Sequence, residues 1–423
     1  MNTKPEGRKG APGGHGPAGP GGRPPFDLSG MKSKEEAIAI LFENWSPAPA
    51  VEEAVLMESS GRTLADDYYA LYNQPVVRSS QMDGIAVRSA DFADGMPDSE
   101  NWVPGTDYVR ADTGDDFDDA FDTVIQIEKV KILENGGVRF EEGFEFVPGD
   151  KVAPSGTNIK AGTQVGVKGT VLTPGKLAYL ALGGHNLIKV YKKPVIGFIP
   201  TGSELVPAGS ELKRGQNFDS NSIMVNAMLT RMGAEVRLHP IIRDDKEMIS
   251  AAVESMLKEV DVLILNAGTS KGGEDYCVQY LEKRGRMLFH GVKAVPGRPM
   301  SITIIDGKPV INMSGPAFAA YYGCTWLMSA VIDRCLAHIE PMFMPTAEAT
   351  LTAEVGGPPF FSAMTSFDLE RDDQGRLLAA PVVTRGPGAK GMSAGLPAPA
   401  HYMTVPGSAP LSAGDRITLI IDK

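Results

Sequence analysis

Apolar and polar positions alternate with different periods along the chain, and these periods predict which segments are helices and which are strands. Apolar side chains recur at helical spacing in residues 34–42 and 51–67, which predicts two helices near the start. Short β-branched runs at residues 123–127 and 137–140, separated by Gly, Pro and Asp turns, predict a small β-rich module. Residues 174–182 return to a helical pattern, which two glycines end.

From residue 193 onward, strand patterns and helix patterns alternate. The expected strands are residues 195–199, 235–238, 261–265 and 309–312. The expected helices are residues 221–232, 246–260 and 275–284, with a long helix after residue 312. This succession predicts a parallel sheet with helices on both faces. The candidates for the inward face of the helix at 221–232 are Ile223, Ala227, Met228 and Leu229.

The last segment of the chain, residues 345–423, is rich in Pro and Gly. It carries alternating strand patterns, including residues 347–355 and the closing run 416–421. Several short strands separated by turn residues are typical of a small all-β fold. The segment therefore predicts a β barrel or a β sandwich.

Charge and composition exclude several classes of protein. The net charge of −11 over 423 residues argues against a nucleic-acid-binding protein, which normally carries a basic footprint. The first thirty residues are rich in Gly and Pro, without the apolar segment of a secretory signal, so we expect a disordered tail. The longest apolar stretch, residues 317–332, is short for a membrane span and is expected to be a core helix. Cys277, Cys324 and Cys335 are expected to be reduced packing residues in a cytoplasmic protein.

Three strand–turn–helix junctions in the α/β region resemble one another, at residues 200–204, 266–276 and 312–318. In the first, Thr201 and Glu204 have the spacing of a capping box, which predicts a helix directly after the turn. Such turns are also ordinary connections in α/β proteins. Three of them at the carboxyl edge of one parallel sheet favour a site for a ligand with phosphate and heterocyclic parts.

The residues at these junctions resemble those of a known family. Thr201-Gly-Ser-Glu-Leu205, followed by residues 215–221, resembles the TGDEL…GxxxDxN pattern of the molybdopterin molybdenumtransferases. That family inserts molybdate into the pterin dithiolene and includes the C-terminal part of gephyrin. Four further segments resemble family patterns and occur in the family's order. Residues 79–87 resemble the family pattern NSAMDGYAV, and residues 110–114 with 124–128 resemble TG…VVxxE. Residues 266–276 resemble SGGxSxGxxDY, and residues 296–299 resemble KPGKP.

The resemblance implies a multidomain α/β plus β fold, usually in a homodimer. It implies a three-layer α/β/α molybdopterin-binding domain, a β-rich module, a small linking α+β domain and a C-terminal β barrel. The expected boundaries are a tail at 1–32, linking segments at 33–65 and 162–193, the β-rich module at 66–161, the α/β domain at 194–343 and the barrel at 344–423. The substrate would bind at the carboxyl edge of the α/β sheet, facing the β-rich module of a partner subunit.

The resemblance also implies a reaction and its partners. Adenylylated molybdopterin and molybdate would be the substrates, with Mg²⁺ as cofactor and AMP as a released product. Molybdoenzymes or other cofactor-biosynthesis proteins would be the possible partners, with neither nucleic acid nor membrane involved. Two alternatives stay open at this point. One is a non-catalytic protein that binds or carries molybdopterin or the cofactor, and the other is an insertase that uses tungstate.

The resemblance carries functional roles onto matching residues of this chain. The expected catalytic residues are Asp83, Glu204 and Asp275, and the expected metal ligands are Glu204, Asp275 and Glu128. Mg²⁺ prefers carboxylate and phosphate oxygens, which suits these side chains. Each acid could instead only cap a helix, set a turn or lie in solvent. The expected substrate-binding residues are Thr113, Gly114, Thr201, Gly202, Asp219, Asn221, Gly268, Ser270, Lys271, Gly272, Gly297, Arg298, Pro299, Ser314 and Gly315.

Several positions depart from the family pattern. Ser203 replaces the acid of TGDEL, and Val295 and Arg298 replace the two lysines of KPGKP. Many of these changes fall where an oxoanion or phosphate would bind, and backbone N–H groups do not readily replace a lost cation. Arg78 and Lys271 are the candidates for compensating positive charge. The other departures are Arg78 for Asp, Ala153 for Arg, Asn158 for Asp, residues 314–317 for the Pro-Gly-Asn-Pro loop, and Pro358 and Ser362 for arginines.

Overall fold

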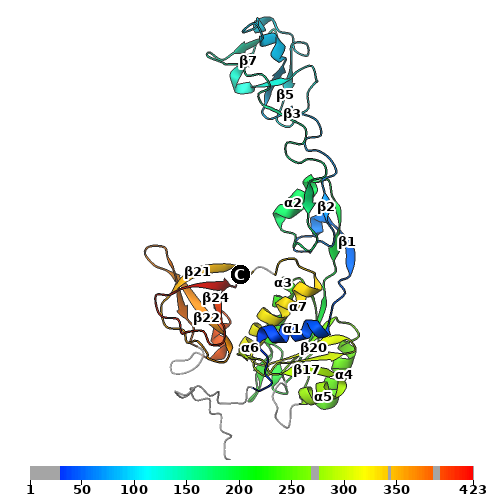
Figure 1. The fold of residues 1–423 in the computed structure, drawn as a ribbon, viewed down its shortest axis with the longest axis vertical. Helices are drawn as coiled ribbons and strands as arrows, with labels where there is room; N and C mark the ends of the chain where they lie inside the picture. Colours follow the sequence, from blue (N-terminus) through cyan, green and yellow to red (C-terminus); the bar gives the residue numbers. More distant parts are fainter. Residues whose placement is uncertain (1–28, 268–275, 342–343, 384–390, 423) are drawn as a thin grey trace, which may run out of the picture. The chain divides into compact units, whose positions relative to one another are not determined.

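The computed structural model describes residues 29–267, 276–341, 344–383 and 391–422. Most of the expected disordered tail lies outside these residues. The described chain forms two compact units (Figure 1). The larger unit comprises residues 29–48, 193–335 and 341–422, and the smaller unit comprises residues 49–192 and 336–340.

A six-stranded sheet forms the centre of the larger unit, in the order β15-β12-β16-β20-β19-β17. The four parallel strands are β12 (Val195–Pro200), β15 (Glu235–Leu238), β16 (Val262–Asn266) and β20 (Lys308–Met313). The expected parallel sheet is thus confirmed for these strands. Two antiparallel strands that were not expected extend the sheet, β17 (Arg286–His290) and β19 (Ser301–Ile305).

The turn between β19 and β20 explains why the antiparallel edge forms. Asp306 and Gly307 have φ angles of 50° and 77°, as the two central residues of a tight hairpin turn require. An Asp-Gly pair between β-branched runs is the sequence signal for such a hairpin. The β19–β20 hairpin, and with it the antiparallel strand β19, could therefore have been predicted from residues 301–310.

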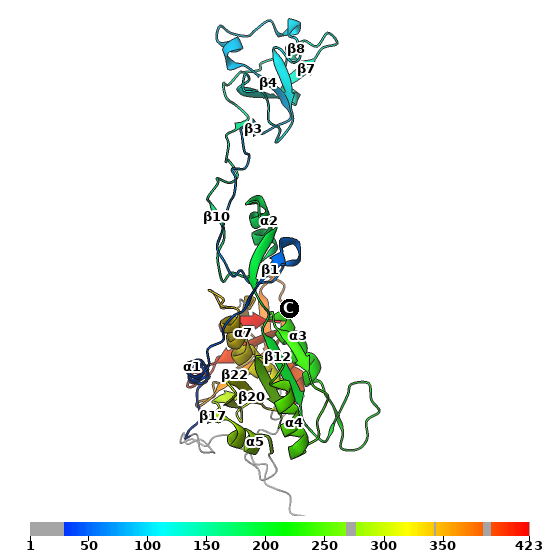
Figure 2. The same cartoon turned by 90° about the vertical axis from the view of Figure 1, so that its right-hand side faces the viewer.

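Helices cover both faces of this sheet (Figures 1 and 2). On one face, α4 (Lys246–Met256) and α5 (Tyr276–Arg284) pack with strand residues such as Leu263 and Leu265 into one apolar core. The other face is covered by α1 (Lys34–Asn44), α3 (Asn221–Arg231), α6 (Ala317–Gly323), a π-helical turn (Cys324–Met328) and α7 (Ser329–Cys335). The expected three-layer α/β/α domain is confirmed.

The inward face of α3 differs in part from the expected one. Met228 and Leu229 are buried, as predicted, but Ile223 is 62% exposed and Ala227 is also exposed. Val225 is buried in their place. The buried positions of α3 therefore follow the helical stripe that begins at Asn221, and the prediction for Ile223 and Ala227 was wrong.

The long apolar stretch near residue 320 is a core helix, as expected. All residues from Phe318 to Met328 are buried. Cys277, Cys324 and Cys335 are buried too, and burial raises the pKa of the Cys324 and Cys335 thiols to about 12. Among the described residues, no helix combines the length and apolar character that crossing a membrane requires.

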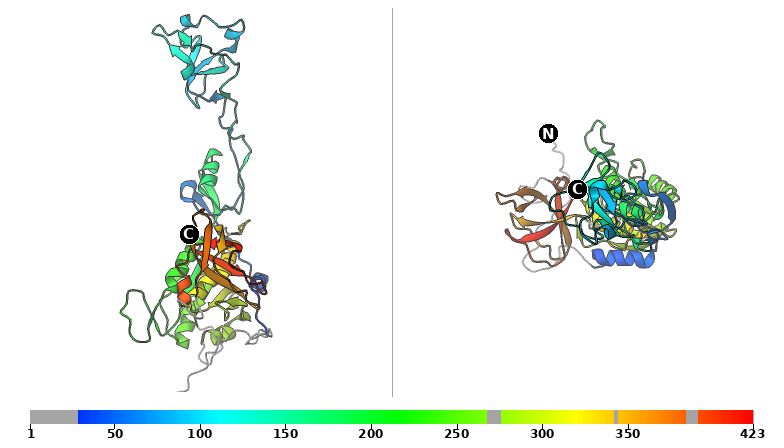
Figure 3. Two further views of the ribbon diagram at one scale, coloured as in Figure 1. Left: turned by 90° about the vertical axis from the view of Figure 1, so that its left-hand side faces the viewer. Right: turned by 90° about the horizontal axis from the view of Figure 1, so that it is seen from above.

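A closed β barrel follows the α/β domain in the larger unit (Figure 3). Its strands pair in the order β22-β23-β21-β25-β24, and β24 pairs back onto β22. Phe367, Leu351 and Leu419 are among the side chains that fill its core. The barrel alternative is thus confirmed. The strands are β21 (Thr346–Leu351), β22 (Ser362–Arg371), β23 (Leu377–Pro381), β24 (Ala400–Thr404) and β25 (Arg416–Ile421).

The smaller unit begins with a strand where a helix was expected. β1 (Val51–Val55) pairs antiparallel with β11 (Leu187–Tyr191), and a single 3₁₀ turn (Leu56–Glu58) follows. The prediction of a helix at residues 51–67 was wrong, because strand pairing with a segment 130 residues away decides the conformation of residues 51–55. In contrast, α2 (Pro174–Leu182) has the predicted bounds.

The β-rich module of the smaller unit is also confirmed. Its central sheet has β4 (Gly84–Val87) between β5 (Tyr108–Ala111) and β6 (Thr123–Gln126). An aromatic cluster that includes Phe92, Trp102 and Phe140 packs beside it. The remaining short pairs are β7 (Val130–Ile132) with β8 (Val138–Phe140), β3 (Ser79–Ser80) with β9 (Val152–Ala153), and β2 (Tyr68–Tyr69) with β10 (Gln164–Gly166).

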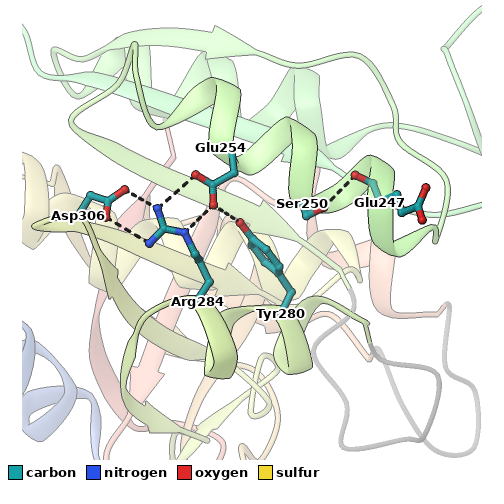
Figure 4. A network of polar contacts seen from close by, with 6 residues as sticks. All are labelled: Glu247, Ser250, Glu254, Tyr280, Arg284 and Asp306. Carbon is teal, nitrogen blue, oxygen red and sulfur yellow. Dashed lines mark hydrogen bonds and ion pairs between the residues drawn. The ribbon is translucent and has the colours of Figure 1, made fainter.

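A polar network links α4, α5 and the β19–β20 turn (Figure 4). The guanidinium group of Arg284 donates to Glu254 at 2.6 and 3.2 Å and to Asp306 at 2.6 and 3.2 Å. The Tyr280 hydroxyl donates to the same Glu254 carboxylate at 2.7 Å. These contacts hold the pKa of Glu254 below its usual range, mainly through the Arg284 hydrogen bond. One carboxylate thus fixes both side chains of α5 to α4.

Gly84 offers a test of the packing between β4 and β6. A Cβ atom at residue 84 would lie 2.0 Å from the main-chain oxygen of Ile125, so the strands would have to separate. We expect Gly84→Ala to lower the free energy of unfolding by about 2 to 3 kcal/mol. Gly175→Ala is the matched control, because nothing lies within 4 Å of its added Cβ. Chemical denaturation of both variants measures the difference, and equal stabilities would contradict this account.

Candidate functional site

Asn266 ends β16 and connects the carboxyl ends of the neighbouring strands. Its side-chain amide is 2% exposed and donates to the main-chain oxygens of Met313 at 3.3 Å and Ser314 at 3.0 Å, both at the end of β20. Its Oδ1 accepts from the amide of Asn221 at 2.8 Å. The same Asn221 amide donates to the main-chain oxygen of Gly315 at 2.6 Å. Asn266 therefore holds the start of α3 and the loop after β20 at one edge of the sheet.

Thr201 follows β12 at this edge and is bonded to the same asparagine. Its main-chain N–H and its hydroxyl donate to the main-chain oxygen of Asn266 at 3.0 and 3.1 Å. The chain then enters a two-residue strand, β13 (Leu205–Val206), which pairs with β14 (Asn217–Phe218). The capping box predicted for Thr201 and Glu204 was wrong, because the next helix begins only at Asn221.

The turn itself places the Glu204 carboxylate over Gly202. A Cβ atom at residue 202 would lie 2.8 and 2.9 Å from the two carboxylate oxygens of Glu204, so the glycine leaves room for them. Ser203 makes reciprocal bonds with Asp244, donating its N–H at 2.9 Å and accepting the N–H of Asp244 at 3.1 Å. Glu204 is exposed, and its carboxylate is available to a ligand.

Asp219 lies just before α3 and is 8% exposed. Its carboxylate accepts from the N–H of Ser222 at 3.0 Å and from the Ser222 hydroxyl at 2.5 Å. Both bonds satisfy donors in the first turn of the helix. The observed contacts of Asp219 therefore match the capping interpretation. Asp219 would act on a ligand only by positioning the neighbouring Asn221.

Two buried polar atoms at this edge have no hydrogen-bond partner within the described part of the chain, namely Asn221 Oδ1 and Ser314 Oγ. The two residues are 8% and 4% exposed. Buried polar atoms in folded proteins nearly always have a partner, so unpartnered ones concentrated at one edge are candidate ligand contacts. Both residues were among those expected from the sequence.

The turn of Gly297, Arg298 and Pro299 also lies in the larger unit, beside α6. Gly297 has a φ of 107°, a backbone conformation that favours glycine, and its added Cβ would lie 3.6 Å from the main-chain oxygen of Ala319. The two-residue strand β18 (Ala294–Val295) precedes it and pairs with the start of β22 in the barrel. The turn therefore lies close to α6 and directly follows a strand that pairs with the barrel.

A second group of expected residues lies at one end of the β-rich sheet in the smaller unit. Asp83 precedes β4, Thr113 and Gly114 follow β5, and Glu128 follows β6. Asp83 Oδ1 accepts from both the N–H and the hydroxyl of Thr113 at 2.7 Å. These bonds, with Arg110 nearby, hold the pKa of Asp83 below its usual range, so it is ionised at neutral pH. Glu128 is exposed.

Arg78, a candidate for compensating charge, is engaged within its own module. Its guanidinium group donates to the main-chain oxygen of Asp118 at 2.9 Å and forms an ion pair with Asp119 at 3.3 Å. It also lies over the Phe117 ring, 4.9 Å from the ring centre. These contacts hold the acidic loop that follows Thr113 and Gly114. Lys271 and the other expected residues of the second junction (Gly268, Ser270, Gly272 and Asp275) lie outside the described residues.

The described residues contain no group of three or more His, Cys, Asp or Glu side chains placed to hold a metal ion. Glu204 and Glu128 also belong to different units. Within each unit, the described side chains therefore form no all-protein metal cage. The donor set does suit Mg²⁺, which often takes only one or two protein carboxylates and completes its shell with substrate phosphates and water.

Sequence reasoning did not select Asn266, although it connects the three strand ends. The available signal was an asparagine closing a run of buried apolar residues at 262–265. A polar side chain in that position must be satisfied inside the fold, which favours a structural or ligand-binding role.

Comparisons with known proteins decide the family. Residues 32–184 match the MoeA N-terminal region (domain I and II), and residues 197–334 match a probable molybdopterin binding domain. The chain is 31% identical over 349 residues to the molybdopterin molybdenumtransferase of Bacillus subtilis (strain 168), covering 78% of this chain and 81% of that protein. This chain belongs to the molybdopterin molybdenumtransferase family. The resemblance stated from the motifs is thereby confirmed.

Further members of the molybdopterin molybdenumtransferase family agree with this assignment. The protein of that name from Staphylococcus aureus (strain COL) is 29% identical over 334 residues, covering 75% of this chain and 78% of that protein. The crystal structure of a molybdopterin biosynthesis MoeA protein from Pyrococcus horikosii superposes with a TM-score of 0.74 at 26% identity. It covers 92% of this chain and 99% of that chain, so the likeness extends across the fold.

The Thr113 bonds to Asp83 give a testable pKa change. Thr113→Val removes the hydroxyl donor, so we expect the pKa of Asp83 to rise toward its ordinary value. In the wild type, the ionised Asp83 carboxylate stabilises the fold above its ordinary pKa, and this contribution is lost as pH falls through the lowered pKa. In Thr113→Val, this contribution to stability should be smaller. NMR titration of the Asp83 carboxyl carbon measures the shift. Thr106→Val, an exposed threonine of the same module, is the control, and an unchanged Asp83 pKa in Thr113→Val would refute the assignment.

Proposed function

We propose that the protein inserts molybdate into adenylylated molybdopterin and releases AMP. The observation that carries this proposal is the edge organised by Asn266, where Asn221 Oδ1 and Ser314 Oγ are buried without partners in the described chain. A pterin presents hydrogen-bond donors and acceptors along its ring edge, and such side chains suit its recognition. Family membership supports the same chemistry.

Cationic and acidic side chains would bind different charged groups, the cationic ones directly to anionic oxygens and the acidic ones to Mg²⁺. Arg298 would bind an oxoanion or phosphate oxygen through charge-assisted hydrogen bonds. Glu204 is the proposed Mg²⁺ ligand in the larger unit, and Asp275 and Glu128 are proposed on the motif match alone. Mg²⁺ bound with substrate phosphates would neutralise charge on the phosphoanhydride. Asp83 and Thr113, which are bonded to each other, would present a fixed anionic turn.

A second candidate function is a protein that binds molybdopterin without inserting metal. Ser203 favours it, because its side chain is occupied by Asp244 and supplies no carboxylate. Val295 and Ser362 favour it too, since neither can supply positive charge and Ser362 is buried, donating to the main-chain oxygen of Thr404 at 2.6 Å. A third candidate is the same insertion reaction with tungstate.

One assay separates these candidates. The protein is incubated with adenylylated molybdopterin, Mg²⁺ and either molybdate or tungstate, and AMP is measured over time. We expect AMP release with molybdate. Tight substrate binding without AMP would leave the non-catalytic binder, release with tungstate alone would leave the tungstate insertase, and absence of binding would reject all three.

Glu204→Gln tests the proposed acidic residue in this assay. The substitution keeps the shape of the side chain but removes its charge. We expect AMP to be released at least about tenfold more slowly, because losing one electrostatic contact to the transition state typically slows a reaction by at least this factor. Glu211→Gln, on the exposed loop between β13 and β14, is the matched control. Asp275→Asn is expected to behave like Glu204→Gln. Wild-type rates in both would reject the metal-site proposal, provided that thermal unfolding is unchanged.

We also propose that the protein is a homodimer in the cytoplasm and serves molybdoenzymes. Exposed apolar side chains on the smaller unit support association, among them Tyr72 and Val76, which are each 64% exposed. Light scattering coupled to size-exclusion chromatography is expected to give a mass near twice the 45.0 kDa of one chain. A mass of one chain at micromolar concentration would contradict the dimer.

A further inference from the structure

A pocket of about 340 Å³ lies in the larger unit between α3, α6 and the C-terminal barrel segment. Its walls are largely apolar and are formed by Met224, Ala227 and Met228 of α3 and by Leu396. Met224 and Ala227 lie outside the buried stripe of α3, whereas Met228 lies at its edge and is 6% exposed. The volume falls at the small end of the range for ligand pockets, enough for one flat ring system.

One end of the pocket carries a fixed group of polar side chains. Asp422 forms an ion pair with Arg231 at 2.9 Å, and it accepts from the Tyr321 hydroxyl at 3.0 Å. All three residues line the pocket. A carboxylate beside a guanidinium group presents an acceptor next to donors. This pairing matches the edge of a heteroaromatic ring that has an amino group beside a ring nitrogen.

The other end of the pocket reaches Ser220. This residue lies between Asp219, which holds the first turn of α3, and Asn221, which is bonded to Asn266. The pocket therefore begins one residue from the side chains proposed to bind the substrate. A ligand held at that edge could extend a second ring along α3.

We propose that this pocket binds the adenine ring of the substrate, with the methionine side chains against the ring face and Asp422 at the amino group. Thioether sulfur makes favourable contacts with aromatic rings, which suits Met224 and Met228. The inference rests on the proposed function for the identity of the nucleotide.

Ala227→Trp tests the pocket by filling it. AMP affinity is measured by calorimetry on the full chain, and we expect at least a tenfold loss in this variant. Ile223→Trp is the matched control, because Ile223 lies on the same helix, is 62% exposed and does not line the pocket. Its AMP affinity should stay within twofold of wild type. No AMP binding by the wild type, or equal affinity in Ala227→Trp, would overturn the proposal.

The polar end is tested by exchanging the base. Inosine monophosphate carries a carbonyl where AMP carries the amino group, so the wild type should bind it at least tenfold more weakly. Asp422→Asn should reduce this preference. Equal affinity of the wild type for both nucleotides would overturn the role given to Asp422.

The outcomes also separate the pocket from the reaction. AMP release by a protein whose AMP affinity is unaffected by Ala227→Trp would reject the pocket and keep the proposed function. Pocket-dependent AMP binding by a protein that releases no AMP from adenylylated molybdopterin would reject the proposed function and keep the pocket.

Discussion

The buried amide of Asn266 is the interaction on which the arrangement of the candidate site depends. Its side-chain N–H groups donate to main-chain oxygens at the end of β20, and its side-chain oxygen accepts from Asn221. Its main-chain oxygen accepts from Thr201. Replacing Asn266 with an apolar residue would leave its buried partners Asn221, Met313 and Ser314 each short of a hydrogen bond, at a cost of about 1 to 3 kcal/mol for each unsatisfied group. The neighbouring loops can therefore differ in side chains without losing their relative placement.

The periodicity of apolar residues predicted the secondary structure correctly wherever the local sequence pattern and the tertiary contacts favour the same conformation. The strands β12, β16 and β20 were predicted because each is a largely apolar run, and α2 was predicted because two glycines end its helical pattern. Residues 51–55 were assigned wrongly because their partner strand, β11, is distant in sequence. The exposed position of Ile223 could not be read from hydrophobicity, because the stripe on α3 is set by where Asn221 must point.

The motif resemblance proposed the candidate site residues as a set, but it did not predict which contacts they make. Thr201 and Glu204 have the spacing of a capping box, yet the hydroxyl of Thr201 bonds across the sheet to Asn266. Asp83 and Thr113 are 30 residues apart in sequence and meet only because β4 and β5 pair. The contacts of Arg78 likewise depend on the fold of the loop opposite it. Composition and spacing carry no information about such pairings.

The pairing of β18 with β22 has a consequence for the evolution of this chain. Because the first residues of β22 hold the segment before the Gly297 turn, the barrel is part of the support for that turn. Ser362 lies at this junction, and its main-chain N–H donates to the oxygen of Lys293 at 2.8 Å. Substitutions that accumulate in the barrel can therefore alter the turn without touching it. Without the barrel, the α/β domain would lose the strand that pairs with the segment before this turn, which is one of the candidate binding loops.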